Sequence, residues 1–203
     1  MLEIPWLMKL FGTTTSPYTR KVRILLKGLV REHQLIDVRT ESGAAAFAAV
    51  APLGKSPVLV TGGEGPVLSD SSLIVSWLWM TEGFTLRAAG WSLDPFDWAD
   101  RGLQVVVEGA LDAAINHRYL RLDGFAESGY IAKQRLRFER TLGWLDGRIT
   151  FGRQLGAAAL SLGCALDWIA FREVADLSRW PGLVAFRAAW QSAGVGAGSE
   201  PCE

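Results

Sequence analysis

The sequence predicts an α/β domain followed by an all-α helical bundle. Two observations support this prediction. Up to about residue 83, short β-type runs alternate with helical segments, whereas after that point apolar residues recur every three or four positions. The chain has 203 residues, of which 49% are hydrophobic and 21% charged. It is therefore long enough to bury a core in each part.

The first part has the order β-α-β-α-β-β-α. The last two strands are separated by Gly-Gly-Glu-Gly at 62–65, which is typical of a hairpin connection. This alternation of strands and helices predicts one small sheet with helices on its faces. In chain order, we expect strands at 9–11, 35–38, 57–61 and 66–68, and helices at 17–31, 43–50 and 71–81.

The second part contains four amphipathic helices between residues 99 and 190, which predicts a bundle. Residues that interrupt helices and strands, including Gly90 and Pro95, lie between the alternating strand-helix pattern of the first part and the helical periodicity of the second. The predicted organisation is a domain at 8–83, a linker at 84–95 and a helical domain at 96–192, with flexible tails at 1–7 and 193–203.

Composition excludes several classes of protein. The 21 basic residues balance 21 acidic ones, whereas a dedicated nucleic-acid binder shows a basic excess. The longest uncharged stretches, 42–54 and 154–166, fall short of the roughly 20 apolar residues of a membrane span. Two cysteines and two histidines leave little scope for a disulfide framework or a metal centre. We expect a cytoplasmic protein without nucleic-acid, membrane or metal partners.

The first candidate site follows the first predicted strand. Ser16 and Pro17 form a strong helix start, with serine at the N-cap and proline at the first helical position. Such a serine is often no more than a cap. However, a hydroxyl at a helix N-terminus also lies in a positive field and can donate to an anion such as a thiolate. Thr14 and Thr15 carry rival hydroxyl groups.

Two further candidate sites precede a strand and a helix. Pro57 begins a predicted strand, where either a cis Ser56–Pro57 bond or a trans proline at the strand start is compatible with the sequence. The cis form leaves neighbouring backbone groups able to pair with a peptide ligand. Asp70 and Ser71 start a helix and are typical caps. Together they also suit an amino-acid head group, because Asp70 can pair with an ammonium and Ser71 can bond a carboxylate.

These three motifs occur in the order seen in glutathione S-transferases. The segments Ser-Pro-Tyr-Thr-Arg-Lys-Val at 16–22, Pro-Leu-Gly-Lys-Ser-Pro-Val-Leu at 52–59 and Asp-Ser-Ser-Leu-Ile at 70–74 resemble that family's thioredoxin-like N-terminal domain. With the helical second half, the resemblance covers residues 8 to about 191. It is greatest to serine-type bacterial members, with a likeness to the zeta and tau classes.

The resemblance implies a detoxifying transferase. Its co-substrate would be glutathione, its second substrate a small hydrophobic electrophile, and its assembly a homodimer in which the sheet domain of one subunit contacts the helical domain of the other. The implied site residues are Ser16 as the catalytic hydroxyl that stabilises the thiolate, the cis-proline Pro57 with the backbone of Ser56 on the cysteinyl part, Asp70 and Ser71 on the γ-glutamyl head, and Lys55 near the glycyl carboxylate.

The sequence also departs from the family pattern. Members usually carry a Ser/Thr-x-x-Asp capping box in the second domain, where this chain has Gly156 and Ala159. We therefore expect a less stable helix start there. Trp98, Arg101 and His117 are candidates for the electrophile site, although a core position is the favoured interpretation of His117.

Two other functions remain as alternatives. Some family members act as non-catalytic protein-interaction modules, which have no physical need for Ser16, Asp70 and Ser71 together. A thiol-disulfide oxidoreductase is disfavoured because no cysteine stands at position 16.

Overall fold

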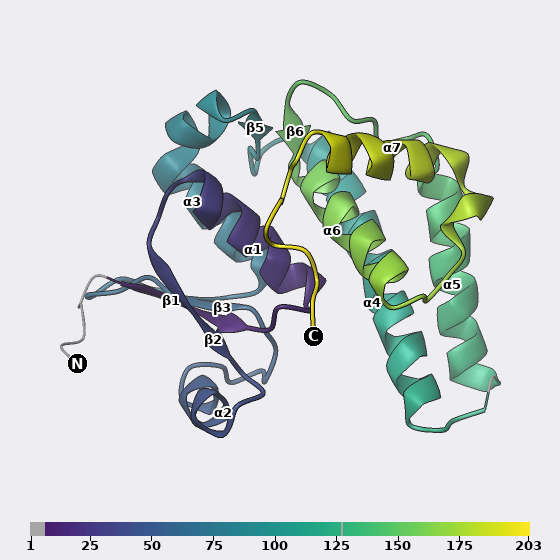
Figure 1. Cartoon of the computed structure of the whole chain (residues 1–203), viewed down its shortest axis with the longest axis horizontal. Coiled ribbons are helices and arrows are strands. Elements are labelled where there is room, and N and C mark those ends of the chain that lie inside the picture. Colours follow the sequence, from purple (N-terminus) through teal and green to yellow (C-terminus); the bar gives the residue numbers. More distant parts are fainter. Residues whose placement is uncertain (1–6, 127) are drawn as a thin grey trace. The chain divides into compact units, whose positions relative to one another are not determined.

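Figure 1 shows a computed structural model of the chain, which describes residues 7–126 and 128–203. Two compact units are present. The first runs to Asp94 and also includes Gly196–Glu203, and the second comprises Pro95–Val195. All but the last residue of the predicted tail at 1–7 lies outside the described residues. No helix in the described part of the chain is long and apolar enough to cross a membrane.

The first unit is built on a four-stranded mixed sheet with the order β2-β1-β3-β4. Strand β1 pairs in parallel with β2 and antiparallel with β3, which pairs antiparallel with β4. The β-α-β-α-β-β-α order predicted from the sequence is confirmed. The strands are β1 (Met8–Gly12), β2 (His33–Asp37), β3 (Val58–Val60) and β4 (Val67–Ser69).

Helices cover both faces of this sheet. The parallel pair β1 and β2 needs a crossover, which α1 (Pro17–Gly28) supplies. Helices α1 and α3 (Ser71–Ala88) lie on one face, and α2 (Glu41–Ala48) lies on the other (Figure 1). Consecutive strand residues point to opposite faces, so the buried pair Leu10 and Phe11 contributes to two core layers.

The second unit is helical, as predicted. Its helices are α4 (Trp98–Leu122), α5 (Gly129–Leu145), α6 (Ala157–Phe171) and α7 (Pro181–Ser192), with a 3₁₀ turn η1 (Leu177–Arg179). The two-residue strand β6 (Leu155–Gly156) stands before α6, whereas β5 (Trp91–Ser92) belongs to the first unit and follows α3. Helix α6 is buried from Ala157 to Ile169, which is expected of a helix that is apolar all round. It contacts both α4 and α7.

The start of α6 corrects the expectation of a weakly capped helix. Its N-cap Gly156 makes no side-chain bond, but the Asp100 carboxylate of α4 accepts from the backbone N–H groups of Ala157 at 2.6 Å and Ala158 at 3.2 Å. A Cβ atom at position 156 would overlap this carboxylate as it is placed, so glycine allows the carboxylate to approach this closely. The cap is therefore present, but it comes from a residue far away in the sequence.

The predicted linker at 84–95 is partly helical. Helix α3 continues to Ala88, with a kink at Glu82 where φ is −129° and ψ is 17°. The helix continues because Leu86 is fully buried and anchors this last section in the core. In contrast, α1 is shorter than predicted and ends at Gly28, with Val30 in the left-handed region at φ 53°.

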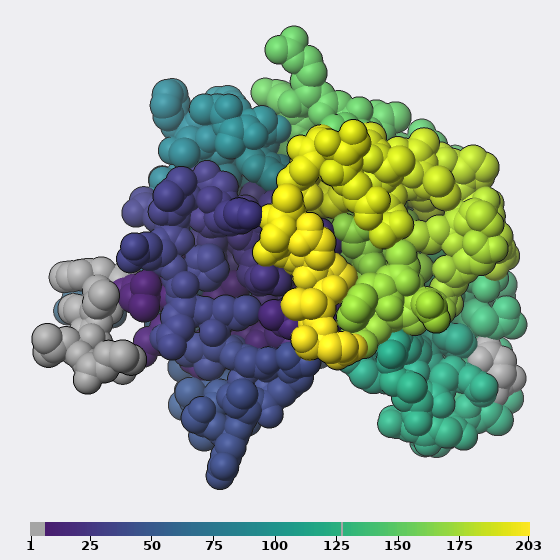
Figure 2. All heavy atoms as spheres, in the orientation of Figure 1, coloured from purple at the N-terminus to yellow at the C-terminus, as the bar shows by residue number. Residues whose placement is uncertain are grey.

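The predicted flexible tail at 193–203 also needs correction. Its last part, Gly196–Glu203, packs against α1 within the first unit (Figure 2). Ser199 is only 3% exposed and its hydroxyl accepts from Nε of Arg20 at 3.3 Å. Arg23 and Lys27 of α1 donate to backbone carbonyl groups of this segment and hold it against the helix.

Candidate functional site

The sheet register brings the three sequence motifs to one edge of the first unit. Phe11 of β1 pairs with Val58 of β3, which pairs with Ser69 of β4. The residues one step beyond this row are Gly12, Pro57 and Asp70. Neighbouring strands lie about 4.8 Å apart. The loop that leads to Ser16, the Ser56–Pro57 bond and the start of α3 therefore lie side by side at this edge.

Ser16 is the N-cap of α1. Its backbone is extended at φ −75° and ψ 123°, and its Oγ accepts from the backbone N–H of Thr19 at 3.2 Å. Pro17 stands at the first helical position, and the first turn carries no acidic side chain. A serine hydroxyl has one hydrogen to donate besides its acceptor sites. Ser16 thus caps the helix and still has a hydrogen for an anion.

The rival threonines have other partners. Thr14 donates its hydroxyl to the backbone carbonyl of Cys202 at 2.8 Å, in the C-terminal segment that packs against α1. The hydroxyl oxygens of Thr13 and Thr15 lie 3.2 Å apart and form a hydrogen bond with each other. The C-terminal segment was not expected here, because nothing in the sequence signals a contact between residues 188 positions apart.

The loop before β3 contains the second motif. The Ser56–Pro57 peptide bond is cis, which is one of the two alternatives that the sequence allows. Ser56 is partly buried and Pro57 is buried. Lys55 is exposed and follows Gly54, which is in the left-handed region at φ 60°. Lys55 lies near the other predicted site residues only because it precedes Ser56 in the chain. Among the predicted site residues, its role is therefore the least constrained by the structure.

The start of α3 contains the third motif. Asp70 is the N-cap, and its Oδ1 accepts from the N–H groups of Ser72 at 2.6 Å and Leu73 at 3.4 Å. Its φ of 79° is unusual for a residue other than glycine, and backbone of this kind concentrates at functional sites. Asp70 is exposed, whereas Ser71 is 2% exposed at the first position of the helix.

Two buried cations of α1 were not assigned a role from the sequence. Arg20 is 2% exposed and Lys21 is 1% exposed, and Nζ of Lys21 lies 5.2 Å from the centre of the Tyr18 ring. Both follow Ser16 within five residues, where their charges favour an anion near the start of the helix. The sequence shows two adjacent basic residues just after Ser16, but it does not indicate that they are buried, because basic residues on a helix are usually exposed.

The three candidates for the electrophile site, all in the second unit, differ in their surroundings. The ring of His117 lies 5.9 Å from the ring of Phe138, and the residue is partly buried rather than in the core. Arg101 donates to Oε1 of Gln104 at 2.6 Å, and Trp98 is 76% exposed. Over residues 7–126 and 128–203, no group of three or more His, Cys, Asp and Glu side chains is arranged to hold a metal ion.

Comparisons with known proteins identify the family of this chain. Residues 10–83 match the family model for the N-terminal domain of glutathione S-transferase. The uncharacterized GST-like protein YibF of Escherichia coli (strain K12) is 31% identical over an alignment of 178 residues, which covers 83% of this chain and 85% of that protein. The chain belongs to the glutathione S-transferase family. The resemblance found in the sequence is confirmed.

Solved structures of this family extend the similarity to the whole chain. A glutathione S-transferase from Methylobacillus flagellatus KT, with GSH bound, is 26% identical with a TM-score of 0.80, covering 96% of this chain and 100% of that one. Another, from Methylobacterium radiotolerans JCM 2831 in complex with glutathione sulfonate, is 26% identical with a TM-score of 0.78 and covers 97% and 95%. The predicted fold, a thioredoxin-like domain followed by a helical one, is confirmed.

Proposed function

We propose that this protein is a glutathione transferase in which Ser16 stabilises the glutathione thiolate for attack on a small hydrophobic electrophile. The observation that carries the proposal is the common sheet edge of Ser16, Ser56–Pro57 and Asp70–Ser71. Family relatives solved with glutathione or glutathione sulfonate bound support it further.

The chemistry of these residues suits the parts of glutathione. Asp70 retains carboxylate lone pairs for the ammonium of the γ-glutamyl head, and Ser71 and the first amides of α3 suit its carboxylate. The backbone of Ser56 would pair with the cysteinyl part, and Lys55 would attract the glycyl carboxylate. In this arrangement the two charged ends orient the peptide, so that its thiol faces the start of α1.

Activation of the thiol requires a lower pKa. A free cysteine thiol has a pKa of about 8.5, and only the thiolate is an effective nucleophile. A pKa lower by about 2 units corresponds to roughly 2.7 kcal/mol. A hydrogen bond from Ser16 to the thiolate supplies about 1.5–3 kcal/mol, and the helix N-terminus adds about 0.3–1 kcal/mol. Ser16 thus needs no general base beside it.

The transfer step then follows from the thiolate. Its sulfur forms a bond to an electrophilic carbon. That carbon either loses a leaving group with its electron pair, or belongs to a polarised double bond whose π electrons move to the electron-withdrawing group and whose other carbon then takes a proton from water. The hydrogen bond from Ser16 weakens as the negative charge leaves the sulfur. Apolar substrates suit this chemistry because exclusion of water keeps the thiolate reactive.

The ultraviolet absorbance of the bound thiolate tests this proposal. We would titrate the glutathione complex of the wild type, Ser16→Ala and Thr40→Ala. Thr40 is a matched control because it caps α2 in the same way, with Oγ1 accepting from the N–H of Gly43 at 3.1 Å. We expect a thiol pKa well below 8.5 in the wild type and Thr40→Ala, and an upward shift of about 1–2 units in Ser16→Ala.

Other results would point to other functions. Glutathione binding with an ordinary thiol pKa in the wild type would favour the non-catalytic interaction module. An equal shift in Ser16→Ala and Thr40→Ala would remove Ser16 from its proposed role. No binding at millimolar glutathione would contradict the proposal as a whole.

We further propose a cytoplasmic homodimer with a detoxifying role, on the basis of the family. Light scattering after size exclusion tests the assembly. A mass of twice the 22.1 kDa of one chain is expected at micromolar concentration. A mass of one chain would contradict the dimer.

A further inference from the structure

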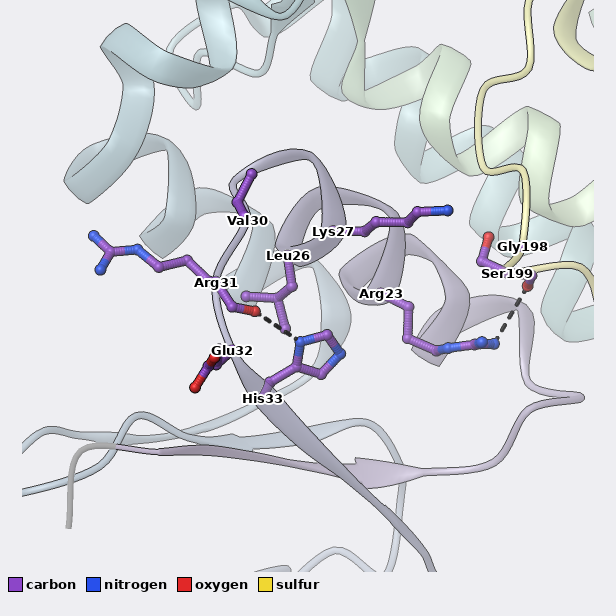
Figure 3. Close-up of a pocket in the computed structure, with 9 residues that line it drawn as sticks. All are labelled: Arg23, Leu26, Lys27, Val30, Arg31, Glu32, His33, Gly198 and Ser199. Carbon is purple, nitrogen blue, oxygen red and sulfur yellow. Dashed lines mark hydrogen bonds between the residues drawn. The ribbon is translucent and has the colours of Figure 1, made fainter. Parts of the chain in front are cut away.

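The C-terminal segment, residues 196–203, lies along α1 and runs toward the start of that helix (Figure 1). Lys27, in the last turn of α1, donates to the carbonyl of Ala197 at 2.6 Å. Arg23, one turn closer to the start of the helix, donates to the carbonyl of Ser199 at 3.3 Å. In Figure 3 both cations extend toward the segment, and a dashed line marks the bond from Arg23. The segment is therefore antiparallel to α1.

Ser199 anchors the segment on the helix. It is buried, and its hydroxyl accepts from Nε of Arg20 at 3.3 Å and donates to the carbonyl of Gly196 at 2.5 Å. Gly196 has a φ of 77°, and a Cβ atom there would lie 2.9 Å from Cδ1 of Ile24. Glycine thus allows the chain to approach α1 this closely. A buried hydroxyl with two bonds gives the segment one defined position on the helix.

The last residues of the segment bond to the loop that precedes α1. Thr14 donates its hydroxyl to the backbone carbonyl of Cys202 at 2.8 Å. Within this loop, residues 13–16, the N–H of Ser16 donates to the carbonyl of Thr13 at 3.3 Å and closes a turn. In the described part of the chain, the bond from Thr14 is the one side-chain hydrogen bond that joins this loop to anything beyond itself and α1.

The turn makes the position of Ser16 depend on Thr14. Thr14 is one of the two central residues of the turn, and its backbone angles set the direction in which the chain reaches Ser16. A hydroxyl that stabilises a thiolate has to lie at hydrogen-bond distance from the sulfur, and a displacement of about 1 Å is enough to weaken such an interaction. A contact that fixes Thr14 therefore also fixes the hydroxyl of Ser16.

The segment also contributes to the burial of a cation near the proposed site. Arg20 follows Ser16 by about one helical turn, and its Nε bonds to the buried Ser199. The attraction between two charges is screened in water and is stronger where water is excluded. Burial against the segment therefore strengthens the effect of Arg20 on an anion at the start of α1.

We propose that the C-terminal segment is a positioning element of the proposed active site, and that Thr14 is a positioning residue for Ser16. The backbone of the segment fixes the loop through Thr14, and Ser199 keeps Arg20 buried. Together these contacts lower the thiol pKa of bound glutathione further than Ser16 and the helix end do by themselves. This inference rests on the proposed function, because it assigns the segment a role in the same site.

The thiol pKa of bound glutathione tests this inference, because a purely structural role of Thr14 would not change it. We would titrate the ultraviolet absorbance of the glutathione complex in full-length Thr14→Val and Thr14→Ser. Valine keeps the shape of threonine without the hydroxyl, whereas serine keeps the hydroxyl. We expect the thiol pKa to rise by about 0.5–1 units in Thr14→Val, or about three- to tenfold in the acidity constant, and by less than about 0.2 units in Thr14→Ser.

The affinity for glutathione separates positioning of the thiolate from binding of the peptide. At a pH of about 5.5 the thiol is protonated, and above about pH 9 it is ionised both free and bound. The Kd of Thr14→Val should be within about twofold of the wild type at the lower pH and about three- to tenfold weaker at the higher pH. An equal loss at both pH values would overturn the inference, because Thr14 would then support binding of the whole peptide.

A second variant tests the other contact, and two more serve as matched controls. Ser199→Ala removes the hydroxyl that bonds to Arg20, so the thiol pKa should rise by about 0.3–1 units. Cys202→Ala keeps the carbonyl that accepts from Thr14, and Lys27→Gln releases only the end of the segment farthest from the site. Both controls should leave the thiol pKa within about 0.2 units of the wild type.

The outcomes separate this inference from the proposed function. A wild-type thiol pKa near the ordinary value of about 8.5 would contradict the proposed function, and the inference with it. A low wild-type pKa that Thr14→Val and Ser199→Ala both retain would overturn the role of the segment alone. The same rise in Cys202→Ala as in Thr14→Val would also overturn it, because the thiol of Cys202 rather than the backbone contact would then be responsible.

Discussion

The helices α1 and α6 begin in different ways. Helix α1 is capped by its own Ser16, a neutral hydroxyl that satisfies one amide. Helix α6 begins at Gly156, which has no side chain, and its first two amides donate to the carboxylate of Asp100. Both arrangements satisfy donors that a helix leaves unpaired. They differ in what happens to the positive end of the helix dipole.

At α6 a negative charge sits directly on the helix end and compensates that field. At α1 the cap is neutral, no acidic residue occupies the first turn, and two buried cations follow. The field at α1 is therefore available to an external anion, whereas the field at α6 stabilises the fold. This difference suggests that one N-terminus serves stability and the other serves the proposed chemistry.

Removal of the Asp100 carboxylate, which caps α6 from another helix, should have the largest effect on stability. Asp100→Ala leaves two amides of α6 without a partner, and we expect a loss of about 2–4 kcal/mol in the free energy of unfolding. Urea unfolding at neutral pH measures it. Asp97→Ala is the matched control, because Asp97 caps α4 through one bond of 3.1 Å to the N–H of Asp100 and should cost about 1 kcal/mol. Equal losses in Asp100→Ala and Asp97→Ala would contradict the expectation that a cap supplied by another helix contributes more to stability than a cap within the same helix.

A local cap should partly replace the borrowed one. Gly156 has φ −81° and ψ 179°, which suits a serine N-cap. In the Asp100→Ala background, Gly156→Ser should restore about 1 kcal/mol. In the wild type the same change should destabilise, because its Cβ would overlap the Asp100 carboxylate. The sign reversal in this double-mutant cycle is the diagnostic result, and additive effects would contradict the model of a shared site.

The cap of α1 should matter less for stability than for chemistry. Ser16→Ala and Thr40→Ala each remove one hydroxyl cap, so each should lower the free energy of unfolding by about 1 kcal/mol. Thermal and urea unfolding test this equality. A loss several times larger in Ser16→Ala would show that Ser16 has a structural role beyond its cap, and the comparison between α1 and α6 would fail.

The pH dependence of Asp100 should give the smallest effect. Burial raises the pKa of this carboxyl above its ordinary 3.8, although the amides of Ala157 and Ala158 oppose the shift. The native state therefore holds the Asp100 proton to higher pH than the unfolded state does. The contribution of Asp100 to the free energy of unfolding falls as the pH rises from its unfolded-state pKa through its native-state pKa. The wild type should gain stability relative to Asp100→Asn as the pH falls from about 7 to about 4. An opposite trend in urea unfolding would contradict the direction of the shift.

Much of the fold was predictable from local patterns. The alternation of strands and helices up to residue 83 and the three-four spacing after it identified every strand of the sheet and the helices α1 to α7. Helix ends were predicted less well, because α3 depends on the burial of Leu86 and α1 on the turn at Val30. Burial and turn geometry depend on neighbours that a local pattern does not specify.

The candidate site divides in the same way. Ser16, Pro57 and Asp70 each stand at the start of an element, so adjacent residues alone indicated that Ser16 and Asp70 are helix caps. The sequence left the cis and trans forms of the Ser56–Pro57 bond open, and the structure decided between them. Only the tertiary structure decided that the register of β1, β3 and β4 brings them to one edge, that Asp100 caps α6, and that the C-terminal segment lies on α1. The reason is physical: capping is an interaction over three or four residues, whereas pairing and packing join residues whose separation in the chain carries no trace of their contact.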